Sequence, residues 1–252
     1  MAGELYRQPG LVTASLLVIG DEILSGRTKD KNIGYIAEYL DRIGIVLREV
    51  RVVPDDEAEI IAAVDALRVR TTYLFTTGGI GPTHDDITAD CIAKALGVSI
   101  DVDPRALKLL SDHYAGRGLE LTPARRRMAR IPAGADLIEN SISVAPGFMI
   151  GNVVVMAGVP AVMQVMLDAV TPRLRTGTPI RSASIDLDCP EGQIAELFAE
   201  HQKAHPAVSM GSYPTLRHGR PATQLVLRAT DEHVLEQAVA GLRVRLSASG
   251  VM

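Results

Sequence analysis

The sequence predicts a doubly wound α/β domain with a mostly parallel sheet and an antiparallel hairpin edge, followed by a small α+β domain. In the first part of the chain, short apolar runs alternate with amphipathic stretches that place apolar residues at helical spacing. This alternation is typical of βαβ units, whose parallel strands are buried on both faces. The apolar runs end in glycine or acidic residues, as expected where strands leave a sheet at a ligand-binding edge.

The elements before the first glycine-rich loop follow this alternation. The apolar run 13–19 predicts the first strand, which ends at Gly20. A helix is expected over 32–43, with Asn32 as its N-terminal cap and Gly44 as its stop. The next predicted elements are a strand over 45–53, a helix over 57–69 and a strand over 73–77.

Helices and a hairpin are predicted after the glycine-rich loop. Two apolar runs, 147–150 and 153–156, are separated by Gly151-Asn152, a good signature of a hairpin, which we expect at the edge of the sheet. An arginine-rich helical segment over 122–130 is either a solvated helical face or a contact for ligand phosphates or for another subunit. The remaining predicted elements are helices over 87–96, 104–117 and 161–170.

A second domain is predicted at the C-terminal end. Residues 171–179 are rich in proline and glycine and indicate a linker, so we expect domains at 1–175 and 176–252. The second domain has a β-α-β-β-α pattern that resembles the KH topology. It has no Gly-x-x-Gly loop and no basic run, so RNA binding is disfavoured and its expected role is packing or dimerisation. Its elements are strands over 180–187, 207–212 and 222–229 and helices over 191–205 and 232–246.

The composition of the 252-residue chain indicates a soluble globular protein. Its 26 basic and 30 acidic side chains give a net charge of −4 with no basic block, which disfavours nucleic acid as a partner. Cys91 and Cys189 lie far apart and indicate neither a disulfide framework nor a zinc site. Residues 1–10 carry no apolar core of signal length, and no later run could span a membrane, so we expect a cytoplasmic protein with no membrane partner.

The loop after the third strand is the first candidate for chemistry. The run Thr77-Gly78-Gly79-Ile80-Gly81 places three glycines where a strand gives way to a helix. Glycine allows a positive φ and a close backbone approach, and a helix N-terminus offers unpaired N–H groups, so the loop suits a phosphate or another anion. An ordinary strand-to-helix turn is the alternative. The loop fits neither a P-loop nor a dinucleotide fingerprint, so neither a kinase nor a Rossmann dehydrogenase is supported.

Acidic residues follow all three strands, at Asp21, at Asp55 and at Asp85-Asp86. In an open parallel sheet these positions meet at the edge where ligands bind. Carboxylates beside an anion-binding loop repel one another and the ligand unless a cation lies between them. Asp21, Asp55 and Asp86 therefore predict a site for a divalent metal such as Mg²⁺ or Co²⁺, which would polarise phosphorus and activate a water. Helix capping and solvation in loops are the alternatives.

Other residues near these strand ends are further candidates. His84 lies inside the loop, where it could act as a base, a metal ligand or a phosphate donor. Gly158 and Pro160 repeat the pattern of a close-approach glycine before a helix N-terminus. Neither cysteine has a histidine nearby in sequence, and no Gly-x-Ser-x-Gly elbow is present, so no nucleophile is predicted.

These motifs resemble those of a known family. The run Thr76 to Pro82 with Asp86-Ile87-Thr88 is similar to the Thr-x-Gly-Gly-x-Gly…Asp-x-Thr motif of the molybdopterin-binding domain of molybdenum cofactor biosynthesis. His84-Asp85-Asp86, the opening Gly20 to Gly26 and Gly158-Val159-Pro160 look most like the branch of competence/damage-inducible protein A and the N-terminal domain of eukaryotic FAD synthases. The resemblance covers about residues 13–175, and the tail looks like the module that follows this domain in the same branch.

The resemblance implies a pocket for molybdopterin or a nucleotide at the glycine loop. In the molybdopterin adenylyltransferases the aspartates that match Asp86 and Asp55 are functional, and the competence-protein branch is associated with metal-dependent hydrolysis of ADP-ribose-type pyrophosphates. A divalent metal, K⁺ as a further ion and a homo-oligomer (dimer or trimer) are also expected. The predicted catalytic residues are Asp55, His84, Asp85 and Asp86, and the predicted binding residues are Gly20, Ser25, Lys29, Asn32, Thr77, Gly78, Gly79, Gly81, Thr88, Gly158 and Pro160.

Departures from the family pattern shape the functional hypothesis. Ile80 stands where the adenylyltransferases have threonine, and Asp85 where they tend to have arginine, which argues against pterin adenylylation. Ala157 and Val162 replace the proline and glutamate common in bacterial competence proteins, so that edge of the pocket is expected to differ. No amidase or adenylyltransferase segment follows, so nicotinamide mononucleotide deamidation and FAD synthesis are not expected.

The leading hypothesis is a metal-dependent pyrophosphohydrolase acting on a substrate of the ADP-ribose or FAD type. One alternative is a molybdopterin-binding or adenylyltransferase protein, which would bind molybdopterin and ATP. The other is a non-catalytic nucleotide-binding module, which would bind its ligand without turnover.

Overall fold

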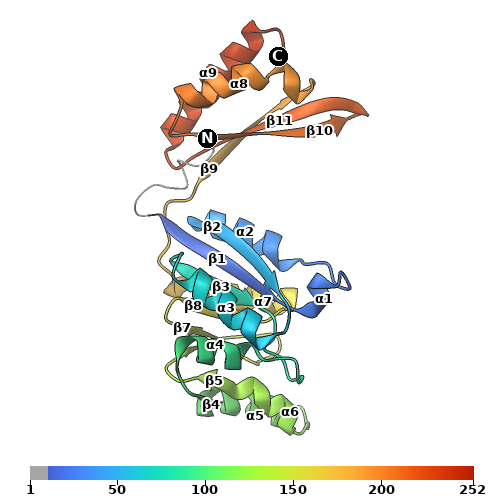
Figure 1. The fold of residues 1–252 in the computed structure, drawn as a ribbon, viewed down its shortest axis with the longest axis vertical. Helices are drawn as coiled ribbons and strands as arrows, with labels where there is room; N and C mark the ends of the chain where they lie inside the picture. The colour runs from blue at the N-terminus through green and yellow to red at the C-terminus, as the bar shows by residue number, and fades with distance from the viewer. Residues whose placement is uncertain (1–10) are drawn as a thin grey trace. The chain divides into compact units, whose positions relative to one another are not determined.

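The computed structural model describes residues 11–252, which form two compact units (Figure 1). The first unit, called the α/β unit below, contains residues 12–176 without 41–45, and the second consists mainly of Gly177–Met252. Residues 1–10, for which no targeting segment is predicted, lie outside the described residues. Within the described part of the chain, every helix is too short or too polar to cross a membrane.

A mixed, mostly parallel sheet forms the centre of the α/β unit, as predicted. The order of its strands is β2-β1-β3-β8-β7-β6. β1 pairs with β3 and β3 with β8 in parallel, whereas β8, β7 and β6 pair antiparallel. The predicted hairpin is therefore confirmed, but β6 adds a further edge strand and leaves β8 inside the sheet. The strands are β1 (Val12–Ile19), β2 (Ile45–Val53), β3 (Tyr73–Thr77), β6 (Asp136–Ile138), β7 (Gly147–Ile150) and β8 (Val153–Met156).

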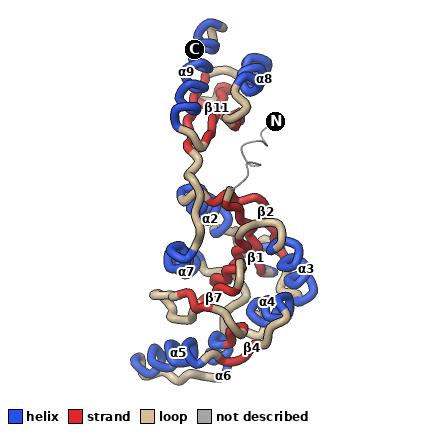
Figure 2. The backbone as a smooth tube through the Cα atoms, turned by 90° about the vertical axis from the view of Figure 1, so that its left-hand side faces the viewer, coloured by secondary structure: helices blue, strands red, loops and turns tan. Residues whose placement is uncertain are grey.

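Helices cover both faces of this sheet, which confirms the doubly wound class. Figure 2 shows α3 and α4 on one side of the strands and α2 and α7 on the other. The packing follows the apolar spacing: Ile60, Val64 and Leu67 of α3 are fully buried, and each such side chain contributes about 1.5–3 kcal/mol of hydrophobic free energy. The helices are α2 (Asn32–Arg42), α3 (Glu57–Arg68), α4 (Thr88–Leu96) and α7 (Pro160–Val170).

The N-terminus of α2 differs from the prediction. Asn32 does not cap this helix: the carboxylate of Asp30 accepts hydrogen bonds from the N–H groups of Asn32 (3.1 Å) and Ile33 (2.7 Å). Asp and Asn are both good caps, and the more exposed carboxylate two residues earlier takes this role. The Asn32 side chain is buried instead and is free for a tertiary contact.

The region between α4 and β6 contains two short strands that the sequence pattern did not reveal, together with the predicted helix over 104–117. Two three-residue strands, β4 (Ile100–Val102) and β5 (Arg130–Pro132), pair antiparallel as a separate small sheet. The helix α5 (Pro104–Gly116) is capped by Asp103, which accepts the N–H of Arg105. The arginine-rich segment is helical only over α6 (Pro123–Arg126), because it continues as a 3₁₀ turn into β5.

The second unit has the predicted β-α-β-β-α order. Its three-stranded sheet has the order β10-β11-β9 and is antiparallel throughout. Its core is built from alternate strand residues such as Leu225 and Leu227 and from Leu242 and Leu246 of the last helix, all fully buried. The elements are β9 (Arg181–Leu187), α8 (Ala195–Ala204), β10 (Ser209–Arg217), β11 (Arg220–Ala229) and α9 (Glu232–Ala248).

Candidate functional site

The candidate site lies at the carboxyl ends of β1 and β3. These strands are neighbours in the sheet although β2 comes between them in sequence, so this edge is a topological switch point, where open α/β sheets bind ligands. Main-chain hydrogen bonds fix the start of both connecting loops. The N–H of Gly20 donates to Val53 O (3.1 Å), and the N–H of Gly78 donates to Met156 O (3.2 Å).

Glycine is required at two positions of the predicted loop. Gly78 has a φ of 102°, and a Cβ there would lie 2.1 Å from Ile19 O. Gly79 has a φ of 64°, and a Cβ there would lie 2.2 Å from Oγ1 of Thr88. Thr88 holds this turn, because its buried hydroxyl donates to Gly78 O (3.0 Å) and its N–H donates to Gly79 O (3.0 Å). Thr88 therefore positions the loop.

A second glycine turn, between β8 and α7, closes on the first. A Cβ on Gly158 would lie 3.2 Å from the Cα of Gly78, so the two main chains are in contact. Nδ2 of Asn32 donates to Gly158 O (2.8 Å) and ties α2 to this turn. Oδ1 of Asn32 and the hydroxyls of Thr76 and Thr77 are the buried side-chain atoms without a hydrogen-bond partner in residues 11–252. Such atoms each cost about 1–3 kcal/mol and are concentrated at this edge.

The glycine loop leaves its central N–H groups free. Within the described residues, the N–H groups of Gly79, Ile80 and Gly81 donate no hydrogen bond. The helix α4 that follows has no side-chain cap at Ile87, although the N–H of its first residue, Thr88, donates to Gly79 O. Successive unpaired N–H groups beside a helix N-terminus form a concavity that suits an anion.

A cavity of about 750 Å³ opens over the two glycine turns. Its volume falls in the range of small-molecule sites, about 300–1,000 Å³. The loop backbone forms one wall, and Ile19, Val162 and Met166 give apolar surface elsewhere. This combination of a polar main chain and apolar side chains suits a ligand that carries both phosphate and a flat ring. The predicted residues that line it are Gly20, Asp55, Gly78, Gly79, Gly81, Asp85, Asp86, Gly158 and Pro160.

The charged side chains that line this cavity are all acidic. Glu22, Asp55, Asp85 and Asp86 face it, and its lining contains no lysine, arginine or histidine. Oδ2 of Asp55 accepts the N–H of Asp21 (3.0 Å). Partial burial raises the pKa of Asp55, the hydrogen bond from Asp21 opposes this shift, and the charges of Asp21, Glu22 and Asp85 add to it. The edge therefore carries negative charge that no basic side chain of the cavity neutralises.

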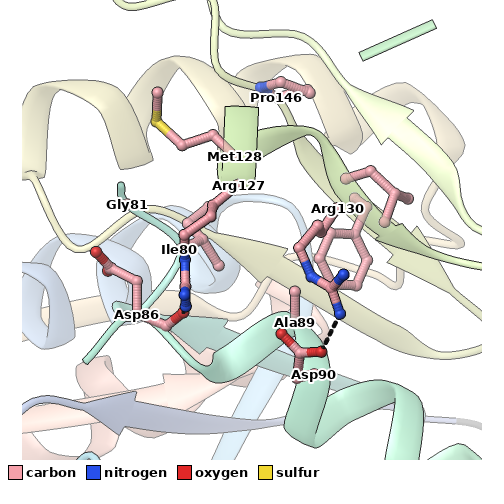
Figure 3. Close-up of a pocket in the computed structure, with 12 residues that line it drawn as sticks. Ile80, Gly81, Asp86, Ala89, Asp90, Arg127, Met128, Arg130 and Pro146 are labelled. Carbon is pink, nitrogen blue, oxygen red and sulfur yellow. Dashed lines mark hydrogen bonds and ion pairs between the residues drawn. The ribbon is translucent and has the colours of Figure 1, made fainter. Parts of the chain in front are cut away.

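Asp86 belongs to the loop itself, and Figure 3 shows it beside Gly81 and Arg127. Its Oδ2 accepts hydrogen bonds from the N–H (2.8 Å) and the hydroxyl of Thr83, which fold the carboxylate back toward Gly81. Nη2 of Arg127 donates to Asp86 O at 3.4 Å. The nearby Arg130 is held by Asp90 (2.5 Å). The choice between a solvated face and a phosphate contact for this arginine-rich segment stays a prediction.

Other predicted residues lie outside the cavity lining. Ser25 ends the short helix α1 (Asp21–Leu24), and Lys29 is exposed. The His84 side chain is 97% exposed and lies 3.9 Å from Asp85. Asp21 contributes its N–H to the site rather than a lining carboxylate.

The predicted metal site lacks a preformed set of ligands. In residues 11–252, no three His, Cys, Asp or Glu side chains are grouped so that they could hold a metal ion. Of the three predicted ligands, Asp55 and Asp86 line the cavity and Asp21 does not. A divalent metal at this edge stays a prediction, and oxygens from a ligand would have to complete its coordination.

Some residues that line the cavity were not predicted from the sequence. Glu22 directly follows Asp21 in the sequence, and Glu22 rather than Asp21 lines the cavity. Tyr114 of α5 and Met128 of the arginine-rich segment reach the cavity from elements with no glycine or acidic signal. Asn140 and Ser143 come from the loop between β6 and β7, where the Asn-x-x-Ser pattern of a side-chain-bonded turn was the available signal.

Comparisons with known proteins identify the families of the two units. The family described as "Probable molybdopterin binding domain" matches residues 15–176, which is most of the chain. The chain belongs to this family. A second family, "FAD synthase, middle domain", matches residues 179–252. The predicted resemblance to the molybdopterin-binding domain is confirmed, and so is the likeness of the tail to a module of FAD synthases.

Individual relatives point to the same branch. The crystal structure of the protein CinA, of unknown function, from Thermoplasma acidophilum is 36% identical, with a TM-score of 0.60 over 64% of this chain and 96% of that chain. A protein of Pyrobaculum arsenaticum is 35% identical over 80% of this chain and 79% of its own length. A CinA-like protein of Geobacter sp. is 37% identical over 93% of this chain but only 58% of its own length, so this chain spans little more than half of that relative.

Proposed function

We propose that the α/β unit binds a phosphorylated pterin or nucleotide in the cavity over the two glycine turns. The observation that carries this proposal is the set of free N–H groups at Gly79, Ile80 and Gly81, beside the uncapped start of α4. These groups would bond the phosphate oxygens, and the apolar side chains of the cavity would contact the ring. Membership of the molybdopterin-binding family supports the same ligand class.

A cation is part of this proposal because of the charge on the cavity lining. A phosphate placed on the loop would face Glu22, Asp55, Asp85 and Asp86, and the lining of this cavity contains no basic side chain to offset them. Arg127 lies on the other side of the loop, where it donates to Asp86 O. Mg²⁺ is held by one or two carboxylates together with substrate phosphates and waters, so it needs no preformed set of three protein ligands. Asp55 and Asp86 would hold the ion with the ligand, and the ion would neutralise the phosphate charge.

Titration calorimetry with the full chain tests the binding function. Molybdopterin, ATP, ADP-ribose and FAD are each titrated with Mg²⁺ or Co²⁺ and with EDTA. We expect at least one of them to bind, and to bind more weakly in EDTA. Replacement of Gly81 by Ala should weaken binding, since a Cβ there would lie 2.7 Å from Oδ2 of Asp86. Gly192→Ala is the matched control, because a Cβ at that position meets nothing within 4 Å. The absence of binding by every ligand refutes the proposal.

Hydrolysis of a pyrophosphate link is the second candidate function. The raised pKa of Asp55, at the edge of the same cavity, favours it, because a carboxylate with a raised pKa is a better general base. In this second candidate function Asp86 would hold the ion and Asp55 would stay uncoordinated, so that Asp55 could take a proton from an attacking water as the bridging P–O bond breaks, which gives two phosphomonoesters. Asp85 and His84 would assist at the rim. The expected result is release of AMP from ADP-ribose or FAD that Asp55→Asn abolishes; tight binding without turnover leaves a non-catalytic nucleotide-binding module.

A further inference from the structure

The loop between β6 and β7 forms a polar part of the cavity lining. Asn140, Ser143 and Ala145 of this loop face the same space as the glycine turns. The register explains why: β7 pairs antiparallel with β8, and Phe148 stands opposite Val155. The residues just before β7 therefore meet the end of β8, at the edge of the sheet that also carries the glycine loop.

Asn140 organises this loop through all of its hydrogen-bonding capacity. It is 6% exposed, and its Oδ1 accepts the N–H groups of Ile142 (3.0 Å) and Ser143 (3.1 Å). These two donors identify which amide atom is the oxygen. Nδ2 then donates to Oγ of Ser143 (2.6 Å) and to Ala145 O (2.9 Å). The amide is fully satisfied, so its role is to hold the loop and not to contact a ligand.

The hydrogen bond from Asn140 determines how the Ser143 hydroxyl can bond. A hydroxyl has one proton to donate, and here a lone pair of Oγ already accepts from Asn140. Within residues 11–252, the Ser143 hydroxyl proton has no acceptor, and Ser143 is an exposed residue that lines the cavity. Val144, the next residue, has a φ of 65°, which is a rare and costly conformation for a β-branched residue. The loop thus maintains local strain while it presents an oriented donor.

We infer that the Ser143 hydroxyl donates a hydrogen bond to an oxygen of the bound ligand and so helps to select it. This inference rests on the proposed function, since it needs a ligand in the cavity. The acceptor is either a phosphate oxygen or a carbonyl oxygen on the ring. ADP-ribose and FAD distinguish these sources, because they share the adenosine diphosphate part and only FAD has a ring system with carbonyl groups.

The test compares Ser143→Ala with Ser141→Ala. Both serines are exposed residues of the same loop, but Ser141 lies outside the cavity lining. Dissociation constants for ADP-ribose and FAD with Mg²⁺ are measured by calorimetry. A neutral carbonyl acceptor predicts about threefold to tenfold weaker binding of FAD alone for Ser143→Ala. A phosphate acceptor predicts a loss of more than about tenfold for both ligands. Ser143→Thr, which keeps the hydroxyl, should restore affinity, and Ser141→Ala should leave it unchanged.

Two results overturn the inference in distinguishable ways. If the wild-type chain binds either ligand and Ser143→Ala binds it equally well, the role of Ser143 is wrong and the proposed function stands. If the wild-type chain binds neither these ligands nor ATP or molybdopterin, the proposed function fails and the inference fails with it.

Discussion

Replacement of Gly79 by alanine should destabilise the α/β unit through two separable effects. The first is the left-handed backbone, with a φ of 64°, which costs a residue with a Cβ about 1–2 kcal/mol. The second is the contact at 2.2 Å with Oγ1 of Thr88, which would push that hydroxyl off Gly78 O. A buried group left without its hydrogen bond costs about 1–3 kcal/mol. We therefore expect a total loss of about 2–5 kcal/mol.

Gly97 provides a matched control for the backbone effect. Its φ is 66°, almost the same as at Gly79, but a Cβ there would meet nothing within 4 Å. Gly97→Ala should cost only the backbone share, about 1–2 kcal/mol. In the double variant Gly79→Ala with Thr88→Ala the clash with Oγ1 is gone, so the two changes should couple by about 1–3 kcal/mol.

These losses in the free energy of unfolding can be measured by urea unfolding, with hydrogen exchange followed on peptides of β1 and β3. Because both strands belong to the α/β unit, the measurement reports on that unit alone. Equal losses in Gly79→Ala and Gly97→Ala would refute the contact with Thr88. Additive losses in the double variant would refute it independently.

Three further outcomes follow from burial and charge. Burial lowers the pKa of His201, so the folded state binds fewer protons than the unfolded state. The stability of the second unit should therefore fall as the pH drops below about 6.5. His201→Gln should remove this pH dependence of the urea midpoint. The pKa of Asp55 is raised from 3.8, so Asp55→Asn should raise the melting temperature at neutral pH, by a margin that narrows as the pH falls toward 3.8. Leu242 of α9 is fully buried, so Leu242→Ala should lower the free energy of unfolding by about 2–5 kcal/mol, as measured by urea unfolding.

The long elements could be predicted because local pattern and tertiary burial agree. β8 (Val153–Met156) is buried at every residue, so its continuous apolar run reflects its real environment. The three-residue strands β4, β5 and β6 are too short to show a period, and neighbouring chain segments rather than propensity fix them. The position of the hairpin in the sheet could not be predicted for the same reason, because β6, the strand that pairs with its outer side, is too short to show an apolar pattern.

The site residues could be predicted from sequence where the backbone conformation requires one residue type. They were harder to predict where two neighbouring side chains could make the same contact. Gly78 and Gly79 are required by positive φ and close contacts, and the sequence alone marks them. Asn32 was expected to cap a helix, but Asp30 has the same chemistry two residues earlier and the better position. Glu22 and Asp21 are equivalent in sequence, and only the path of α1 decides which carboxylate faces the cavity.

The contact between Gly78 and Gly158 also bears on how the site forms during folding. The loop at Gly78 is held by Met156 O, and β3 needs β8 beside it, so the anion-binding turn depends on a pairing between distant parts of the chain. Contacts of large sequence separation form slowly, because a long loop must close before they stabilise the structure. A nascent chain that has not reached β8 has the sequence of the glycine loop but not its geometry. The ability to bind the ligand should therefore appear only after β8 has paired with β3.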